Sequence, residues 1–265
     1  MHFVCPDELV ALAHQLSDIA RPIAAHYFRN DDLVVELKSA HDPVTIADRL
    51  IEEKWREIIM ARRPQDGIWG EEYGRHNIDA ELTWIFDPID GTKIFTLGRA
   101  TFGTLIGLYH RTHGFILGVI DQPIVGLRWV GAKNCGATLN GKKLGSKETP
   151  DISHWRSSIN NLPRLPAELQ ALNDQLRNEV HFISFGGDCM NYAGLADGAL
   201  HYYFDNQQQI FDFAAVIPIL NETGGVLTQI DGSPIGMEEK YYTVLGGATK
   251  EIHEQVLAKY RAIAK

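Results

Sequence analysis

Residues 83–92 are Thr83-Trp84-Ile85-Phe86-Asp87-Pro88-Ile89-Asp90-Gly91-Thr92, an apolar run that leads directly into two acids. The run predicts a strand, and Pro88 disfavours helical geometry at Asp87, so we expect both acids on a turn at the strand end. Gly91 and Thr92 permit close backbone approach and can open a helical turn whose free N–H groups suit a phosphate. The turn can therefore hold a metal and an anion side by side, although ordinary surface turns are also rich in Asp, Pro and Gly.

Other acids stand where predicted elements begin or end. Glu71 follows Ile68-Trp69-Gly70 and is expected at a second strand end, although Glu71-Glu72 could also be a solvated charge pair. Asp212 lies between two phenylalanines at a predicted helix start, where Asp often serves as an N-terminal cap. Thr45-x-x-Asp48 fits a capping box, which gives Asp48 a structural explanation of its own. Spacing alone does not decide between these interpretations.

Hydrophobic periodicity divides the chain into two halves. Apolar residues recur at helical spacing over 7–29 and 45–62, and a largely antiparallel sheet is expected from 68 to about 139, with strands at 83–86, 102–109, 115–120 and 127–131. The polar segment 145–154 could join the halves. Beyond it we expect strands at 156–160, 180–185 and 199–204 and helices at 166–177, 188–197 and 212–222. The predicted division is an N-terminal α+β half over 1–145 and a C-terminal α/β half over 146–265.

Composition and charge exclude several classes of protein. The formal charge is −9, from 25 Lys and Arg against 34 Asp and Glu, and the basic residues form no stripe, so nucleic acid is a poor candidate partner. The N-terminus lacks the features of a signal peptide, and no stretch approaches the roughly 18 apolar residues of a membrane span. The three cysteines, Cys5, Cys135 and Cys189, form no metal or redox pattern. We expect a soluble, reduced protein of the cytoplasm.

Several motifs, taken in order, resemble the inositol monophosphatase family. They are Glu36-x-Lys38-x3-Asp42-Pro43-Val44-Thr45-x2-Asp48, Gly70-Glu71-Glu72, Asp87-Pro88-Ile89-Asp90-Gly91-Thr92 and Asp212-x-Ala214-Ala215. The match runs from about residue 7 to residue 250. It implies an α/β (α+β) fold, the layered αβαβα sandwich of the inositol monophosphatase and fructose-1,6-bisphosphatase type, and usually a homodimer.

The same resemblance implies a magnesium-dependent phosphatase acting on a small soluble phosphate ester. Up to three Mg²⁺ ions would be bound by Glu71, Asp87, Asp90, Asp212 and the carbonyl of Ile89. Gly91 and Thr92 would hold the phosphate, while Asp48 and Thr92, with Glu71, would orient the attacking water. Phe211 replaces a Trp that many relatives carry, which should alter packing and not ligation. The residue types agree independently, because Mg²⁺ prefers oxygen ligands and none of these positions is His or Cys.

Within the family, the chain looks most like the histidinol-phosphate phosphatase branch, which acts in histidine biosynthesis. The cue is Phe185-Gly186-Gly187-Asp188-Cys189, together with Gly70-Glu71-Glu72-Tyr73-Gly74 and Asp48-Arg49. A carboxylate facing the leaving group would favour the cationic groups of histidinol phosphate, and Asp188 and Asp205 are the candidates.

Alternatives remain for both the side chains and the function. Asp188 could instead cap a helix, and Asp205-Asn206 could form a turn. The alternative substrate is inositol-1-phosphate or a broader set of sugar phosphates. The missing basic surface disfavours a nuclease, and the intact acid set disfavours a non-catalytic binding protein.

Overall fold

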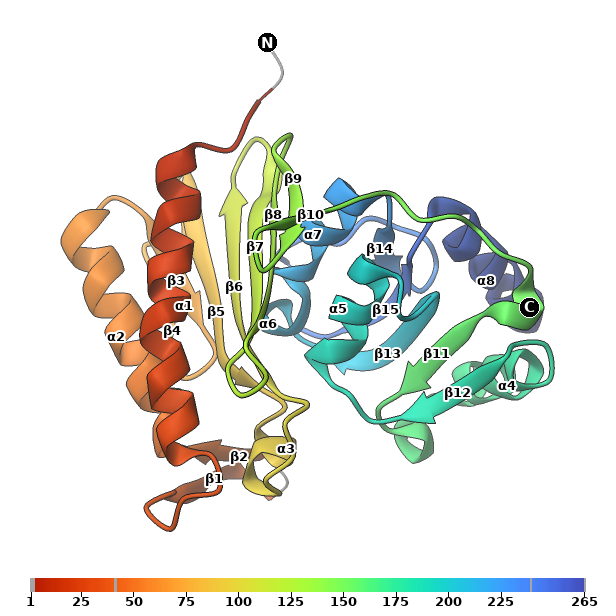
Figure 1. Ribbon diagram of the computed structural model, residues 1–265, viewed down its shortest axis with the longest axis horizontal. Coiled ribbons are helices and arrows are strands. Elements are labelled where there is room, and N and C mark those ends of the chain that lie inside the picture. Colours follow the sequence, from red (N-terminus) through yellow and green to blue (C-terminus); the bar gives the residue numbers. More distant parts are fainter. Residues whose placement is uncertain (1–2, 41, 239, 265) are drawn as a thin grey trace.

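The computed structural model describes residues 3–40, 42–238 and 240–264, and its elements form alternating helical and sheet layers (Figure 1). One face of a large sheet is covered by α1 (Asp7–Tyr27) and α2 (Ile46–Arg62). The middle helical layer contains α5 (Cys189–Asp197), α6 (Ile210–Phe213) and α7 (Val216–Thr223). Smaller sheets follow, and α4 (Ala167–Arg177) and α8 (Lys250–Ile263) lie outermost. The expected αβαβα sandwich is confirmed.

The large sheet has eight strands in the order β10-β9-β8-β7-β6-β5-β3-β4. Its strands are β3 (Gly67–Gly70), β4 (Gly74–His76), β5 (Leu82–Asp90), β6 (Gly103–His110), β7 (Gly114–Gln122), β8 (Leu127–Ala132), β9 (Gly136–Leu139) and β10 (Lys142–Leu144). All neighbours are antiparallel except β3 and β5, which are parallel with Gly70 opposite Phe86. The acids that follow β3 and those that end β5 therefore lie at the same edge of the sheet.

Glycines bring the middle helices unusually close to the sheet. A Cβ atom at Gly118 would lie 1.8 Å from the carbonyl oxygen of Ala215, and one at Gly107 would lie 2.7 Å from the Cβ of Ala214. Any larger residue at either position would push α6 and α7 away from the strands. Because α6 carries Asp212, this close packing fixes the distance between Asp212 and the end of β5.

The second half contains two small sheets. β13 (Tyr202–Gln208), β15 (Tyr242–Gly247) and β14 (Val226–Gln229) form an antiparallel sheet in that order, while β11 (Arg156–Ile159) and β12 (Phe182–Phe185) pair in parallel. Short 3₁₀ turns span Ile152–His154 and Leu162–Arg164. A hydrophobic core of this half, with Trp155, Leu172 and Tyr202 buried, lies beneath α4 and α8.

Some predicted boundaries are wrong. The helix expected over 212–222 is two helices, α6 and α7, because Pro218 cannot donate a backbone hydrogen bond to Ala214 and its ring crowds that carbonyl. The strand expected over 199–204 begins at Tyr202, since Leu200 N–H still bonds to Gly194 in the turn after α5. The first helix ends at Tyr27, two residues early.

Several elements were not predicted. They are β1 (Val35–Ser39), β2 (Asp42–Thr45), the short α3 (Thr92–Thr96) as a complete helix, β10, β14, β15 and α8. Helices in the described part of the chain are all too short or too polar to cross a membrane.

Candidate active site

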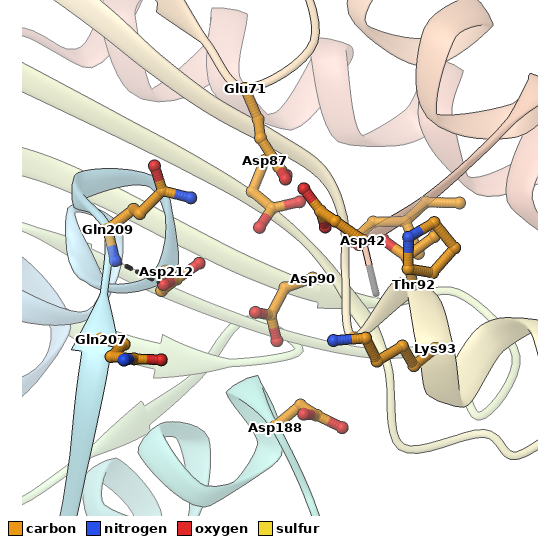
Figure 2. Close-up of a pocket in the computed structure, with 13 residues that line it drawn as sticks. Asp42, Glu71, Asp87, Asp90, Thr92, Lys93, Asp188, Gln207, Gln209 and Asp212 are labelled. Atoms are coloured by element: carbon orange, nitrogen blue, oxygen red, sulfur yellow. Dashed lines mark hydrogen bonds between the residues drawn. The ribbon is translucent and has the colours of Figure 1, made fainter. Parts of the chain in front are cut away.

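Three acids meet at the end of β5. One carboxylate oxygen of each of Asp87, Asp90 and Asp212 lies within 4.8 Å of the others. The ladder between β5 and β6 is irregular between Asp87 and Asp90, which allows both side chains to face the same side, and Asp212 reaches them from α6 (Figure 2). The structure therefore joins acids that are up to 125 positions apart in the sequence.

These acids are held in an unfavourable electrostatic environment. Burial, followed by the charges of neighbouring acids, raises the pKa of Asp87 and of Asp212 well above the usual range, and raises the pKa of Asp90 to about 7. Asp87 Oδ1 is buried and has no hydrogen-bond partner among the described residues. Two carboxylates 4 Å apart repel by about 4 kcal/mol at an effective dielectric near 20. Cations bound between them would remove this cost.

Glu71 stands beside the cluster, immediately after β3. Its backbone N–H donates to Phe86 O at 3.1 Å, which ties it to the end of β5. Its carboxylate accepts from Lys38 Nζ of β1 at 2.8 Å, and the same amine contacts Glu72 at 2.9 Å. Glu71-Glu72 is therefore not the freely solvated charge pair that the sequence left open. Glu72 is the more buried of the two acids at its side chain, and burial raises its pKa to about 7.

Asp48 belongs to the capping box at the start of α2 and contacts Thr92, which lines the pocket, although Asp48 itself is buried and does not line it. Its Oδ2 accepts from the backbone N–H of Thr45 at 2.8 Å, so the predicted capping box is present. Its Oδ1 lies 3.3 Å from the hydroxyl of Thr92. That hydroxyl also lies 3.0 Å from the carbonyl oxygen of Ile89. Burial raises the pKa of Asp48 to about 6.

Gly91 connects the acids to Thr92 and to Asp188. It adopts φ 85°, a left-handed conformation that favours glycine, and a Cβ atom there would lie 3.2 Å from Asp188 Oδ2. The main chain therefore approaches the pocket closely at the residue where the phosphate was expected.

Asp188 precedes α5, but its side chain does not cap that helix. The residue has φ 42°, its carboxylate makes no capping hydrogen bond, and its buried Oδ2 has no partner in the described part of the chain. Burial and then the charge of Asp205 raise the pKa of Asp188 to about 6, while Lys93 lowers it. The capping interpretation is wrong for this side chain.

Asp205 lies inside β13 and not on a turn. Its carboxylate accepts hydrogen bonds from Tyr203 Oη at 2.5 Å, Asn206 N at 2.8 Å and Asn160 Nδ2 at 3.1 Å. Asn160 Oδ1 in turn accepts from the backbone N–H of Asp188 at 3.0 Å. Asp205 is thus connected to Asp188 through Asn160 and does not line the pocket directly.

The pocket that joins these residues has a volume of about 250 Å³. It also contains Asp42 and Pro43, which the sequence analysis placed in a motif without a role in the site, and Lys93, Gln207 and Gln209, which it missed. The amine of Lys93 points toward Asp90 and Asp188 (Figure 2). Gln209 N–H donates to Asp212 Oδ2 at 2.7 Å, so Asp212 forms a capping box as well as facing the cluster. Lys93 follows Thr92 directly and could have been found, whereas no sequence signal singled out Gln207.

Comparison with known proteins gives a consistent result. The family model for inositol monophosphatases matches residues 6–265. The chain is 32% identical over 259 residues to the bifunctional phosphatase IMPL2 of Arabidopsis thaliana, covering 95% of this chain and 74% of that protein. It is 34% identical over 217 residues to a histidinol-phosphatase of Chlorobaculum parvum, covering 81% and 83%. An inositol monophosphatase structure from Zymomonas mobilis matches with a TM-score of 0.84 and 34% identity, covering 96% and 98%.

Proposed function

The chain belongs to the inositol monophosphatase family, a family of metal-dependent phosphatases, and on this basis we propose that it is a Mg²⁺-dependent phosphomonoesterase that hydrolyses histidinol phosphate to histidinol and phosphate. The observation that carries the substrate proposal is the buried Asp188 Oδ2, which has no hydrogen-bond partner among the described residues and belongs to a residue that lines the same pocket as the acid cluster. In this proposal the Asp188 carboxylate pairs with a cationic leaving group. The 34% identity to a histidinol-phosphatase supports the same proposal.

The residues of the site fit a hard divalent cation. The donors are oxygens, Asp87 Oδ1 lacks a partner among the described residues, and burial beside neighbouring acids raises the pKa values of Asp87 and Asp90. We propose that Glu71, Asp87, Asp90, Asp212 and the carbonyl of Ile89 hold up to three Mg²⁺ ions. When bound, Mg²⁺ supplies activation of a water and neutralises charge on the phosphate oxygens.

Asp48 and Thr92 are proposed to position the attacking water. If Ile89 O is occupied as a ligand, the Thr92 hydroxyl donates its one proton to Asp48 Oδ1, and its lone pairs are left to accept a hydrogen bond from the water. The capping box fixes Asp48 Oδ2, so Oδ1 keeps its direction. Glu71 assists in positioning this water, and the backbone of Gly91 and Thr92 holds the phosphate. The water attacks directly, so no phospho-enzyme is expected.

Asp188 is proposed to contact the ammonium or imidazole of histidinol phosphate. Asp205 supports Asp188 in two ways. Its hydrogen bond to Asn160, which in turn accepts from the Asp188 backbone, holds that backbone in place, and its own negative charge lies near Asp188. Binding a cation would relieve the buried charge of Asp188.

One observation favours the alternative substrate class. Lys93 is close enough to lower the pKa of Asp188, and its amine faces that acid (Figure 2). If Lys93 neutralises Asp188, a neutral alcohol such as inositol would fit the leaving-group side equally well.

The deciding experiment is phosphate release at saturating Mg²⁺ from histidinol phosphate, inositol-1-phosphate, a nucleotide monophosphate and fructose-1,6-bisphosphate. We expect the highest kcat/KM for histidinol phosphate. A preference for inositol-1-phosphate would contradict the branch assignment and leave the phosphatase assignment intact. No release from any of the four would contradict the enzyme itself.

We further propose a homodimer in the cytoplasm, with the chain divided near residue 145. All three cysteines are free thiols, which is compatible with a reducing compartment. Size-exclusion chromatography with light scattering tests the assembly.

A further inference from the structure

A second recess lies at the opposite end of β11 from Asp188. Its lining consists of Pro150, His154, Arg156, His181 and His201, and its volume is about 390 Å³. Arg156 begins β11, and Asn160, which bonds to Asp188, follows its end, so the strand separates the two sites by about 13 Å at roughly 3.3 Å per residue. The recess is distinct from the proposed catalytic pocket, because the two share no lining residue.

Strand pairing brings the basic side chains together. Arg156 N–H donates to His201 Nδ1 at 2.9 Å, and His201 N–H donates back to Arg156 O at 2.9 Å. On the other side, His181 N–H donates to Trp155 O at 2.8 Å. Residues 156, 181 and 201 therefore stand at adjacent strand starts, held by two backbone hydrogen bonds and by one from the Arg156 backbone to the His201 ring.

Arg156, which lines the recess, has a hydrogen-bond donor that is not used within the described part of the chain. Arg156 Nη2 donates to Gly198 O at 2.9 Å, whereas its Nε is buried without a hydrogen-bond partner in the described residues. Since His201 Nδ1 accepts a hydrogen bond, its neutral ring carries the proton on Nε2. Burial and the charge of Arg156 lower the pKa of His201, which favours this neutral form.

The chemistry of the recess suits an anion. None of the described lining residues is acidic. The nearby Asp151 is directed to Ser153, accepting from its N–H at 3.0 Å and its Oγ at 2.6 Å. A metal fits less well, because the ligand atoms of the three imidazoles do not all lie within 4.8 Å of one another. Among the described residues, only Asp87, Asp90 and Asp212 form such a group.

We propose that this recess is a second binding site for a phosphate group, separate from the catalytic pocket, in which Arg156 and His201 donate to the anion and His154 and His181 close around it. A guanidinium beside neutral N–H donors is a common arrangement for binding phosphate oxygens. The ligand is either free phosphate or a phosphate ester, and the two share this chemistry.

The test is a titration of the full-length protein in excess chelator, where the acid cluster disfavours anions. Inorganic phosphate is added at constant ionic strength, with chloride as the balancing salt, and histidine-ring resonances are followed by NMR after assignment through single His→Gln variants. We expect saturable shifts at His154, His181 and His201. Linear shifts equal to those caused by chloride would overturn the proposal.

Variants give the decisive comparison. Arg156→Gln should weaken phosphate binding roughly tenfold or more, the loss expected for a hydrogen bond to a charged group. Arg177→Gln, which removes the same charge from an exposed position on α4, should leave binding unchanged. An unaltered affinity in a folded Arg156→Gln protein would contradict the site.

Two further arms complete the test. Arg156 also donates to the carbonyl of Gly198 at the end of α5, so loss of this bond in Arg156→Gln could prevent folding. His181→Ala avoids this problem because it removes an exposed ring, and it should still weaken phosphate binding severalfold. Unchanged binding in His181→Ala and in Arg156→Lys would contradict the proposed donors. Phenyl phosphate, compared with inorganic phosphate in the same titration, distinguishes an ester site from a free phosphate site by the tighter binder.

Discussion

At the scale of the residue, Asp188 separates the two proposed substrate classes. Asp188→Asn should lower kcat/KM for histidinol phosphate by roughly 10- to 100-fold, because it removes a charged hydrogen bond, and should change the value for inositol-1-phosphate much less. The ratio of the two constants cancels any general damage. Asp174→Asn, an exposed acid on α4, is the matched control. Equal losses on both substrates would reduce Asp188 to a structural role.

The acid cluster makes a different prediction about single residues. Asp87→Asn and Asp212→Asn should abolish turnover while the protein stays folded, since an amide keeps the shape and loses the charge that Mg²⁺ requires. Thr92→Ala should lower kcat more than it raises KM if the hydroxyl orients water mainly in the transition state, and Thr92→Ser should retain most activity. Steady-state kinetics at saturating Mg²⁺ measures each effect, and near-normal turnover in Asp87→Asn would argue against the mechanism.

Residues on regular patterns could be predicted from the sequence, and residues placed by irregular backbone could not. The strand that carries Asp87 and Asp90 was predicted, and so was the Thr45-Asp48 capping box. The turn expected at Pro88 is wrong, because β5 continues through Pro88 to Asp90 with only an irregularity in its ladder to β6. Gln207 reaches the pocket from an irregular part of β13, where it has φ 58°, and no local propensity for glutamine predicts that conformation. Which acids meet one another depended on the family resemblance, because spacing left each with a structural explanation.

At the scale of the element, the β1–β2 hairpin closes onto the site through Lys38. Its amine contacts Glu71 at 2.8 Å, so that ion pair competes with metal binding. Lys38→Gln should tighten Mg²⁺ binding by roughly two- to fivefold, the range for a partly exposed ion pair. Calorimetric titration measures it, with Lys54→Gln, which loses an exposed pair on α2, as the control. Weaker Mg²⁺ binding would show instead that Lys38 holds Glu71 in place for the metal.

Element prediction succeeded where one hydrophobic period dominates and failed where packing overrides it. α1 and α2 are amphipathic and each lies against one sheet face, so their periodicity was clear. α7 is apolar and lies between two sheets, so its hydrophobic pattern runs on across the break at residues 214–215, and only Pro218 marks that break in the sequence. The hairpin strand β1 alternates apolar and polar residues over Val35–Ser39, but the run is only five residues long and all of them are exposed, so no buried face supports the pattern.

At the scale of the whole molecule, the buried acids make stability depend on pH. The folded protein raises the pKa of Asp48 and Asp188 to about 6 and of Asp90 to about 7, whereas unfolded Asp titrates near 3.9. Between about pH 4 and 7 the folded state binds more protons, so stability falls as pH rises. In chelator, the Tm should be higher at pH 5 than at pH 8 in a thermal melt. A Tm that does not change with pH would contradict the idea that the buried acids cause this dependence. An equal change of Tm with pH in Asp90→Asn would contradict it as well.

Mg²⁺ should reverse that loss, because it binds the ionised form of the acids that folding crowds together. A metal bound only by the native state adds about 2.7 kcal/mol at a hundredfold excess over its dissociation constant. For a domain of this size each kcal/mol corresponds to roughly 2–4 °C, so the Tm at pH 8 should rise by about 5–10 °C. The rise should be much smaller at pH 5, where protons already occupy the acids and compete with the metal. Asp212→Asn should start from a higher Tm in chelator, since one repelling charge is gone, and should gain less from Mg²⁺. A parent protein whose Tm is the same in chelator and in Mg²⁺ would show that the cluster does not bind the ion, whatever its geometry.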